Sequence, residues 1–136
     1  MSLTITPVYA GLLAFVYFYL TMRVVRRRQT RRIPVGTVRG DADDREMLRA
    51  VRVHANFAEY APFSLLLIAF AELSGTWPLL VHAMALVLVA GRTAHAYGLA
   101  REPDHFPARR WGMYLTAAAM LTAAAACIVL GIRTWL

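Results

Sequence analysis

A row of polar residues that could bind a ligand runs along the first half of a hydrophobic segment. The row consists of Arg45, Arg49, Arg52, Asn56 and Glu59. Because the spacing alternates between three and four residues, these side chains fall on one side of an α-helix. Arginine binds carboxylates, glutamate accepts hydrogen bonds from an ammonium group, and asparagine pairs with peptide groups. The row therefore suits a ligand with two or more carboxylates and one ammonium group.

The rest of the chain indicates that this row lies in a membrane protein. Hydrophobic residues make up 59% of the 136 residues, and the mean hydropathy is +0.48. Four long apolar runs predict an all-α integral membrane protein, a bundle of four transmembrane helices in one domain spanning residues 1–136. The expected helices cover about residues 3–28, 45–73, 77–100 and 108–133. Inside a membrane segment, a polar row is costly unless it faces protein, water or a ligand.

The charge distribution predicts how the chain crosses the membrane. The net charge is +7, and all 15 Lys and Arg residues are arginine. Most of them follow the first and third apolar runs, where they act as topology signals and contact phosphate headgroups. We therefore expect these two loops in the cytoplasm, both termini outside, and the protein in the inner (plasma) membrane. No nucleic-acid partner is expected, because the sequence contains no basic module with interleaved aromatic residues.

This topology brings three polar segments together at the cytoplasmic face: the row described above, the end of the third helix and the start of the fourth. The candidate site residues are Arg49, Arg52, Asn56, Glu59, Tyr60, Arg92, His95, Tyr97, Arg109, Arg110 and Tyr114. The sequence shows no nucleophile triad, metal-ligand spacing or glycine-rich phosphate loop. An enzyme of this composition would position a reactive ligand and stabilise its anion. The alternative for any single arginine is a structural ion pair or a headgroup contact. For Arg45 and Arg49, which lie nearer the loop, we expect headgroup or interface contacts.

Three motifs carry a resemblance to a known family. They are Arg52-x-x-x-Asn56-x-x-Glu59-Tyr60-x-Pro62, Gly91-Arg92-x-x-His95 and Arg110-x-Gly112-x-Tyr114, with a Pro34-Val35-Gly36 loop before them. In these residues the chain resembles the MAPEG family (membrane-associated proteins in eicosanoid and glutathione metabolism), particularly its short bacterial members. The resemblance implies a homotrimer that binds glutathione as cosubstrate between neighbouring subunits, near the cytoplasmic face.

The resemblance also implies a role for individual residues. Arg52 would bind a glutathione carboxylate, Asn56 the peptide backbone and Glu59 the amino group, with Tyr60 in support. Arg110 would be catalytic, because it matches the family arginine that stabilises the glutathione thiolate and so forms the nucleophile at neutral pH.

The same resemblance places further residues in the glutathione site and leaves two choices open. The further residues are Arg92, His95, Tyr97, Tyr114 and Arg28. Arg27 is an alternative to Arg28 as the arginine that ends the first helix. Arg109 is an alternative to Arg110 in the thiolate role, because the loop before the fourth helix differs from that of relatives.

The expected function is that of a membrane glutathione transferase or peroxidase. Its substrates would be lipophilic small molecules from the bilayer, either electrophiles or lipid hydroperoxides, and no metal takes part. Ala55 stands where some relatives have a second arginine, so eicosanoid synthesis does not carry over. The alternative is a non-catalytic MAPEG-like scaffold or accessory subunit of a larger membrane complex. A channel or transporter is disfavoured because the chain lacks repeated or broken helices.

Overall fold

The computed structural model describes residues 2–32 and 42–133 of the chain. Within these residues the chain forms four α-helices: α1 (Thr6–Arg31), α2 (Ala42–Leu73), α3 (Pro78–Ala100) and α4 (Phe106–Arg133). The all-α class and the four long apolar helices are thus confirmed. The largest difference from the expected ranges is three residues, at both ends of the first helix and at the start of the second. The loop containing Pro34-Val35-Gly36 lies outside the described residues.

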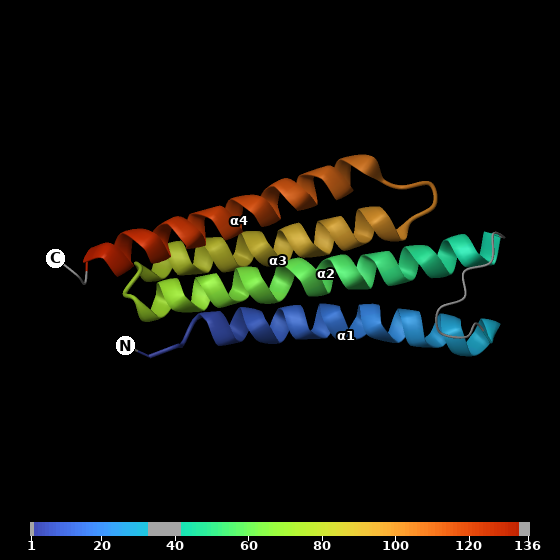
Figure 1. Cartoon of the computed structure of the whole chain (residues 1–136), viewed down its shortest axis with the longest axis horizontal. Helices are drawn as coiled ribbons and strands as arrows, with labels where there is room; N and C mark the ends of the chain where they lie inside the picture. Colours follow the sequence, from blue (N-terminus) through green and yellow to red (C-terminus); the bar gives the residue numbers. More distant parts are fainter. Residues whose placement is uncertain (1, 33–41, 134–136) are drawn as a thin grey trace.

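The helices lie side by side in the order α1, α2, α3, α4 and alternate in direction (Figure 1). The described ends of the chain lie at one end of the bundle, together with the α2–α3 turn. The end of α1, the start of α2 and the α3–α4 loop lie at the other end. All four helices contain spans long and apolar enough to cross a membrane. At about 1.5 Å per residue, even the 23-residue α3 exceeds the roughly 30 Å hydrocarbon layer.

Proline and glycine set several of the helix boundaries. Proline stands in the first turn of α1 and of α3, where its missing N–H would have no partner in the helix. Between α2 and α3, Gly75 has a φ of 88°, a left-handed conformation that glycine adopts without steric cost. The amide of Thr76 then donates to the Ala71 carbonyl at 3.1 Å and closes the turn.

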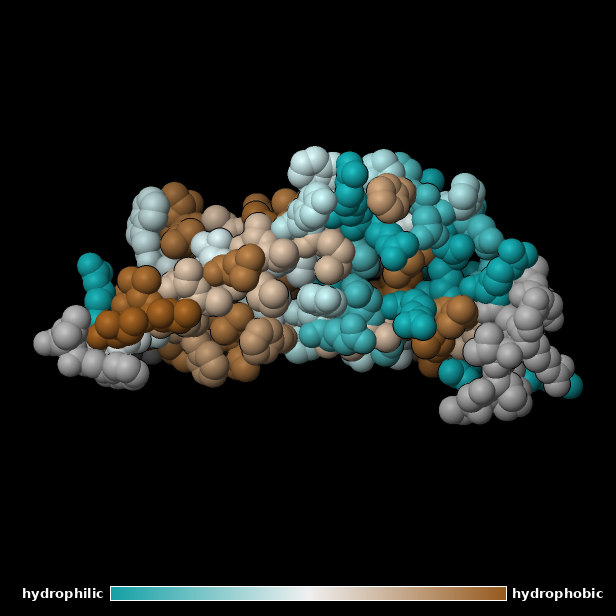
Figure 2. Space-filling model, turned by 45° about the horizontal axis from the view of Figure 1, so that its top comes forward, coloured by the Kyte–Doolittle hydropathy of each residue, from teal (hydrophilic) through white to brown (hydrophobic). Residues whose placement is uncertain are grey.

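Hydrophilic residues gather at one end of the surface and hydrophobic residues cover the other (Figure 2). The hydrophilic end is the one that holds the α3–α4 loop and the start of α2. With 32 residues, α2 is about 48 Å long at 1.5 Å per residue. Its first turns, which carry Arg45, Arg49 and Arg52, therefore extend past the apolar part of the bundle.

Glu72 holds α1 against α2 at the opposite end. Its carboxylate accepts hydrogen bonds from the backbone amides of Thr4 and Ile5, both at 2.7 Å, and from that of Thr6 at 2.8 Å. These amides stand at the start of α1, where backbone donors have no partner within the helix. A negative charge at this position also complements the helix dipole. The only acidic residue near the α2–α3 turn therefore has a structural role.

Helices α3 and α4 make the closest contact in the bundle, and glycine allows it. A Cβ atom added to Gly91 would lie 2.9 Å from the Thr116 amide nitrogen and 3.0 Å from the Gly112 carbonyl oxygen. A Cβ atom on Gly112 would lie 2.7 Å from the Gly91 carbonyl oxygen. Such direct backbone contact through small residues is the preferred packing of helices in lipid. It places the start of α4 beside the end of α3.

We expect Gly112→Ala to destabilise the bundle by about 2 kcal/mol or more, because the new methyl group would meet backbone atoms that cannot rotate away. Thermal unfolding in detergent micelles would measure the effect. The matched control is Gly131→Ala on the same helix, where an added Cβ meets nothing within 4 Å. Equal behaviour of the two variants would contradict the packing described here.

Candidate functional site

A cavity of about 500 Å³ opens at the hydrophilic end, between α2 and the facing parts of α3 and α4. Three helices contribute its lining. The lining residues are Arg52, Ala55, Asn56 and Glu59 from α2, His95 and Leu99 from α3, and Arg109 and Met113 from α4. The structure thus brings together three members of the polar row of α2, Arg52, Asn56 and Glu59, with one histidine and one arginine from the other two expected segments.

The α2 residues present two opposite charges to this cavity. Arg52 and Glu59 are exposed, and the structure gives neither of them an ion pair or a side-chain hydrogen bond with any described residue. They are seven positions apart, which is about 10 Å along a helix, so they do not neutralise each other. Asn56 lies between them and is half-buried. The cavity therefore offers a cationic group, an amide and an anionic group in that order.

Arg92 lies behind this surface and does not line the cavity. Its side chain is 1% exposed. The Nη1 atom donates to Asn56 at two points, to the carbonyl oxygen at 3.2 Å and to Oδ1 at 3.1 Å. The guanidinium carbon also lies 5.3 Å from the centre of the Tyr60 ring. Arg92 and Tyr60 therefore support the site from within the bundle.

The contact between Arg92 and Asn56 fixes which atoms the asparagine can offer. Arginine has only hydrogen-bond donors, so the Asn56 atom that faces it must be the amide oxygen. The amide nitrogen is then left to donate to a ligand. In this orientation Asn56 suits a carbonyl or carboxylate oxygen in the cavity.

His95 links α3 to the first turns of α4. Its Nδ1 atom lies 3.0 Å from the Arg109 carbonyl oxygen. Because a carbonyl only accepts hydrogen bonds, Nδ1 must carry the proton, and a neutral ring then has an unprotonated Nε2. The side chain is 5% exposed and lines the cavity. His95 thereby holds the backbone of Arg109 at the cavity wall.

Arg109 and Arg110 face different directions. Successive residues on a helix point about 100° apart, and of these two only one lines the cavity. Arg109 does so. Arg110 lies instead with its guanidinium carbon 5.6 Å from the centre of the Phe106 ring. Arg110 therefore does not line this cavity within one subunit, and its contact with the thiol stays a prediction.

Two of the expected tyrosines lie away from the cavity. Tyr97 follows His95 by two residues and so emerges on the other side of α3, where it lines a separate groove between α1 and α3. The Arg101 guanidinium carbon lies 4.4 Å from its ring centre. Tyr114 is exposed on α4 and packs edge-on against Trp111, with ring centres 5.8 Å apart.

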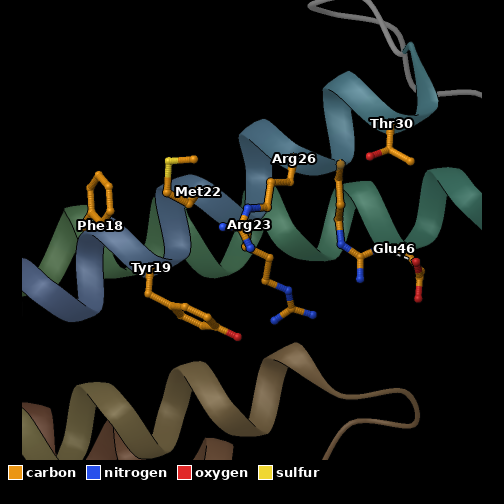
Figure 3. Close-up of a pocket in the computed structure, with 8 residues that line it drawn as sticks. Phe18, Tyr19, Met22, Arg23, Arg26, Thr30 and Glu46 are labelled. Carbon is orange, nitrogen blue, oxygen red and sulfur yellow. Dashed lines mark hydrogen bonds and ion pairs between the residues drawn. The ribbon is translucent and has the colours of Figure 1, made fainter.

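The end of α1 forms a second cavity of about 480 Å³. Its lining residues are Phe18, Tyr19, Met22, Arg23, Arg26, Arg27, Thr30 and Glu46. Tyr19 and Arg23 extend from α1 toward α3 (Figure 3), and Arg23 donates to the Ala100 carbonyl at 2.9 Å. Arg27, which forms an ion pair with Glu46, lines this second cavity, whereas Arg28 lines neither cavity.

Sequence reasoning missed part of the site. Met113 follows Arg109 by one helical turn, so its place on the same face could have been found from spacing. Headgroup or interface contacts were expected for Arg49, and the structure shows that it forms an ion pair with Asp104 in the α3–α4 loop. No local pattern indicates this pairing. Within residues 2–32 and 42–133, no cluster of His, Cys, Asp and Glu side chains could hold a metal ion.

We expect Asn56→Ala to destabilise the protein by about 1–3 kcal/mol, because it removes the side-chain acceptor of a buried guanidinium and leaves only the backbone carbonyl. The Arg92→Met background should remove most of this loss, since no buried charge then needs the asparagine. Thermal unfolding of the unaltered protein, the two single variants and the double variant would measure the coupling free energy between the two residues. Arg52→Met is the control background, because Arg52 makes no described contact with Asn56. Additive effects of Asn56→Ala and Arg92→Met would contradict the assigned contact.

Known proteins match this chain over nearly its whole length. The model of the MAPEG family matches residues 6–129, which include almost all of the four helices. Inner membrane protein YecN of Escherichia coli strain K12 is 35% identical over 117 residues, covering 86% of this chain and 85% of the relative. The protein of the same name from Escherichia coli O6:H1 strain CFT073 gives the same values. The four apolar helices and the match across them show that the chain belongs to the MAPEG family.

Proposed function

We propose that this protein is an inner-membrane glutathione transferase or peroxidase, with glutathione bound in the cavity between α2, α3 and α4. The observation that carries the proposal is the pair of opposite charges in that cavity, Arg52 and Glu59, which lie on either side of Asn56 and form no ion pair with any described residue. Glu59 lies within the α2 span that is long and apolar enough to cross a membrane, and an ionisable residue inside such a segment commonly marks a functional site. A zwitterionic ligand would satisfy both charges at once.

Glutathione fits this pattern in charge and in length. It carries two carboxylates and one ammonium group, joined by peptide groups. Arg52 would bind a carboxylate, the Asn56 amide nitrogen a peptide carbonyl, and Glu59 the ammonium group. A fully extended tripeptide spans roughly 10 Å at about 3.3–3.6 Å per residue. This length matches the separation of about 10 Å between Arg52 and Glu59 along α2.

For the thiol we propose Arg109 in place of Arg110. Arg109 lines the same cavity as the α2 residues, whereas Arg110 stacks on Phe106 outside it. A guanidinium beside the sulfur stabilises the thiolate, which is the nucleophilic form. Arg92 and Tyr60 would then act behind Asn56 and would not touch the ligand. Tyr97 and Tyr114 would lie outside the part of the site that a single subunit forms.

The thiolate would react with a lipophilic partner that arrives from the bilayer. With an electrophile, the sulfur forms a bond to carbon and a leaving group departs with the electron pair. With a lipid hydroperoxide, two glutathione molecules supply two electrons and become a disulfide, and the hydroperoxide becomes an alcohol and water. Met113 and Leu99 give the cavity an apolar side that suits either substrate.

We further propose that the protein is a homotrimer with its glutathione site facing the cytoplasm and both termini outside. The arginine-rich bundle end supports this orientation through the positive-inside rule, and the YecN relatives are named inner membrane proteins. In a trimer, the end of α1 from a neighbouring subunit would bring an arginine to the cavity. Arg27, which lines the second cavity, is then a stronger candidate than Arg28.

We expect Arg52→Ala to weaken glutathione binding about 10- to 100-fold, because it removes a charge-assisted carboxylate contact. Arg109→Ala should leave most of the affinity but abolish the ultraviolet absorbance of the bound thiolate. Calorimetric titration and absorbance of the protein in lipid nanodiscs would measure the two effects.

Arg110→Ala is the matched control for Arg109→Ala, since the two residues are adjacent and carry the same charge. If Arg110→Ala loses the thiolate and Arg109→Ala retains it, the assignment must return to Arg110. If the unaltered protein binds no glutathione at millimolar concentration, the enzyme proposal fails and the scaffold alternative is favoured.

A further inference from the structure

Asp104 connects two arginines from different helices. It lies in the loop between α3 and α4, and both of its carboxylate oxygens are engaged. Oδ1 accepts from Nη1 of Arg49 on α2, and Oδ2 accepts from Nη1 of Arg109 on α4 at 2.9 Å. Its side chain is 28% exposed, so the carboxylate is partly shielded from water. The loop carboxylate is therefore held from both sides.

Arg49 in turn has a fixed position. Its Nη1 atom donates to the Arg101 carbonyl at 2.9 Å and approaches the Leu99 carbonyl at 3.5 Å. These carbonyls stand at the end of α3, where backbone acceptors have no partner within the helix. A cation there is also favoured by the helix dipole. Arg49 thus ties the long helix α2 to the end of α3, and the same Nη1 atom also donates to Asp104.

This chain of contacts ends at a cavity residue. Arg109 has a side chain that is 45% exposed, and a long exposed side chain normally samples many rotamers. Its bond to Asp104 uses one of its five N–H donors, which leaves the others for a ligand in the cavity. Its backbone carbonyl is held by His95. The backbone and the guanidinium of Arg109 are thus fixed by separate contacts.

We propose that Asp104 is a positioning residue that directs the Arg109 guanidinium toward the sulfur of the ligand, with Arg49 as its support. The inference rests on the proposed function, because it assigns the thiolate contact to Arg109. Asp104 itself would not touch the ligand. It lowers the freedom of Arg109 and keeps two like charges, Arg49 and Arg109, near each other by lying between them.

The test compares Asp104→Asn with Glu102→Gln. Both variants remove one negative charge from the same loop, and Glu102 lies 3.9 Å from Arg49 without contacting Arg109 among the described residues. The expected result for Asp104→Asn is a loss of thiolate absorbance of about tenfold at neutral pH, as is usual when a reacting group is misplaced. The dissociation constant for S-methylglutathione, which has no ionisable thiol, should change less than about threefold, because Arg52, Asn56 and Glu59 remain. Glu102→Gln should resemble the unaltered protein.

Two further variants separate positioning from folding. Asp104→Glu keeps the carboxylate and should retain more thiolate than Asp104→Asn. Arg49→Gln removes the support and should lower the thiolate in the same direction, and the double variant with Asp104→Asn should lose little more. This second route remains usable if Asp104→Asn does not fold.

The outcomes differ for the two proposals. If the unaltered protein forms no thiolate, the proposed function fails, and this inference fails with it. If the unaltered protein forms thiolate and Asp104→Asn matches Glu102→Gln, only the positioning role is overturned. A rise in thiolate in Asp104→Asn would also overturn it, because Asp104 would then be an anion that competes with the ligand for Arg109.

Discussion

The site depends on a buried cation, Arg92, that has no carboxylate partner among the described residues. A guanidinium in the interior of a membrane bundle is stable only if its donors are satisfied by nearby acceptors. Asn56 supplies two of these acceptors, and the Tyr60 ring and the Met113 sulfur contact the guanidinium as well, whereas the buried Nε atom has no hydrogen-bond partner among the described residues. Because these partners come from α2 and α4, the Arg92 guanidinium on α3 fixes the positions of the three helices relative to one another. It also turns the amide nitrogen of Asn56 toward the cavity.

That arrangement requires α4 to approach α3 very closely. The approach is possible because Gly91 and Gly112 carry no side chains at the crossing. The same contact brings His95 to the backbone of Arg109 and Met113 to Arg92. Packing and polar contacts therefore support each other, since the glycines alone would not select one rotation of α4. The contacts of His95 with the Arg109 carbonyl and of Arg92 with the Met113 sulfur select one rotation of α4. In this rotation Arg109, and not Arg110, faces the cavity.

The sequence predicted the helices and the common position of Arg52, Asn56 and Glu59 on one side of α2, but not which residues of the other helices face them. Apolar length and charge asymmetry determine where helices begin and end, and both are local properties. The spacing of Arg52, Asn56 and Glu59 likewise needs only one helix. The choice between Arg109 and Arg110 depends on the rotation of α4 against α3, which a motif within α4 does not contain. The pairing of Arg49 with Asp104 joins residues 55 positions apart, and no periodic pattern records such a contact.

The arginines at the hydrophilic end fall into two groups. In one group the hydrogen-bond donors are used within the fold, and in the other group donors remain available for a ligand. Arg23 and Arg49 bind carbonyls at the end of α3, so their donors are used within the fold. Arg52 makes no such contact with the described residues, and Arg109 uses only part of its donor capacity. A topology signal alone would not require this division, because any arginine at the membrane surface satisfies the positive-inside rule. This division has a physical reason if Arg23 and Arg49 stiffen the end of the bundle. Arg52 and Arg109 can then hold a charged ligand at a defined distance from the apolar wall of the cavity. A soluble cosubstrate and a lipid-soluble one could then meet at a single cavity.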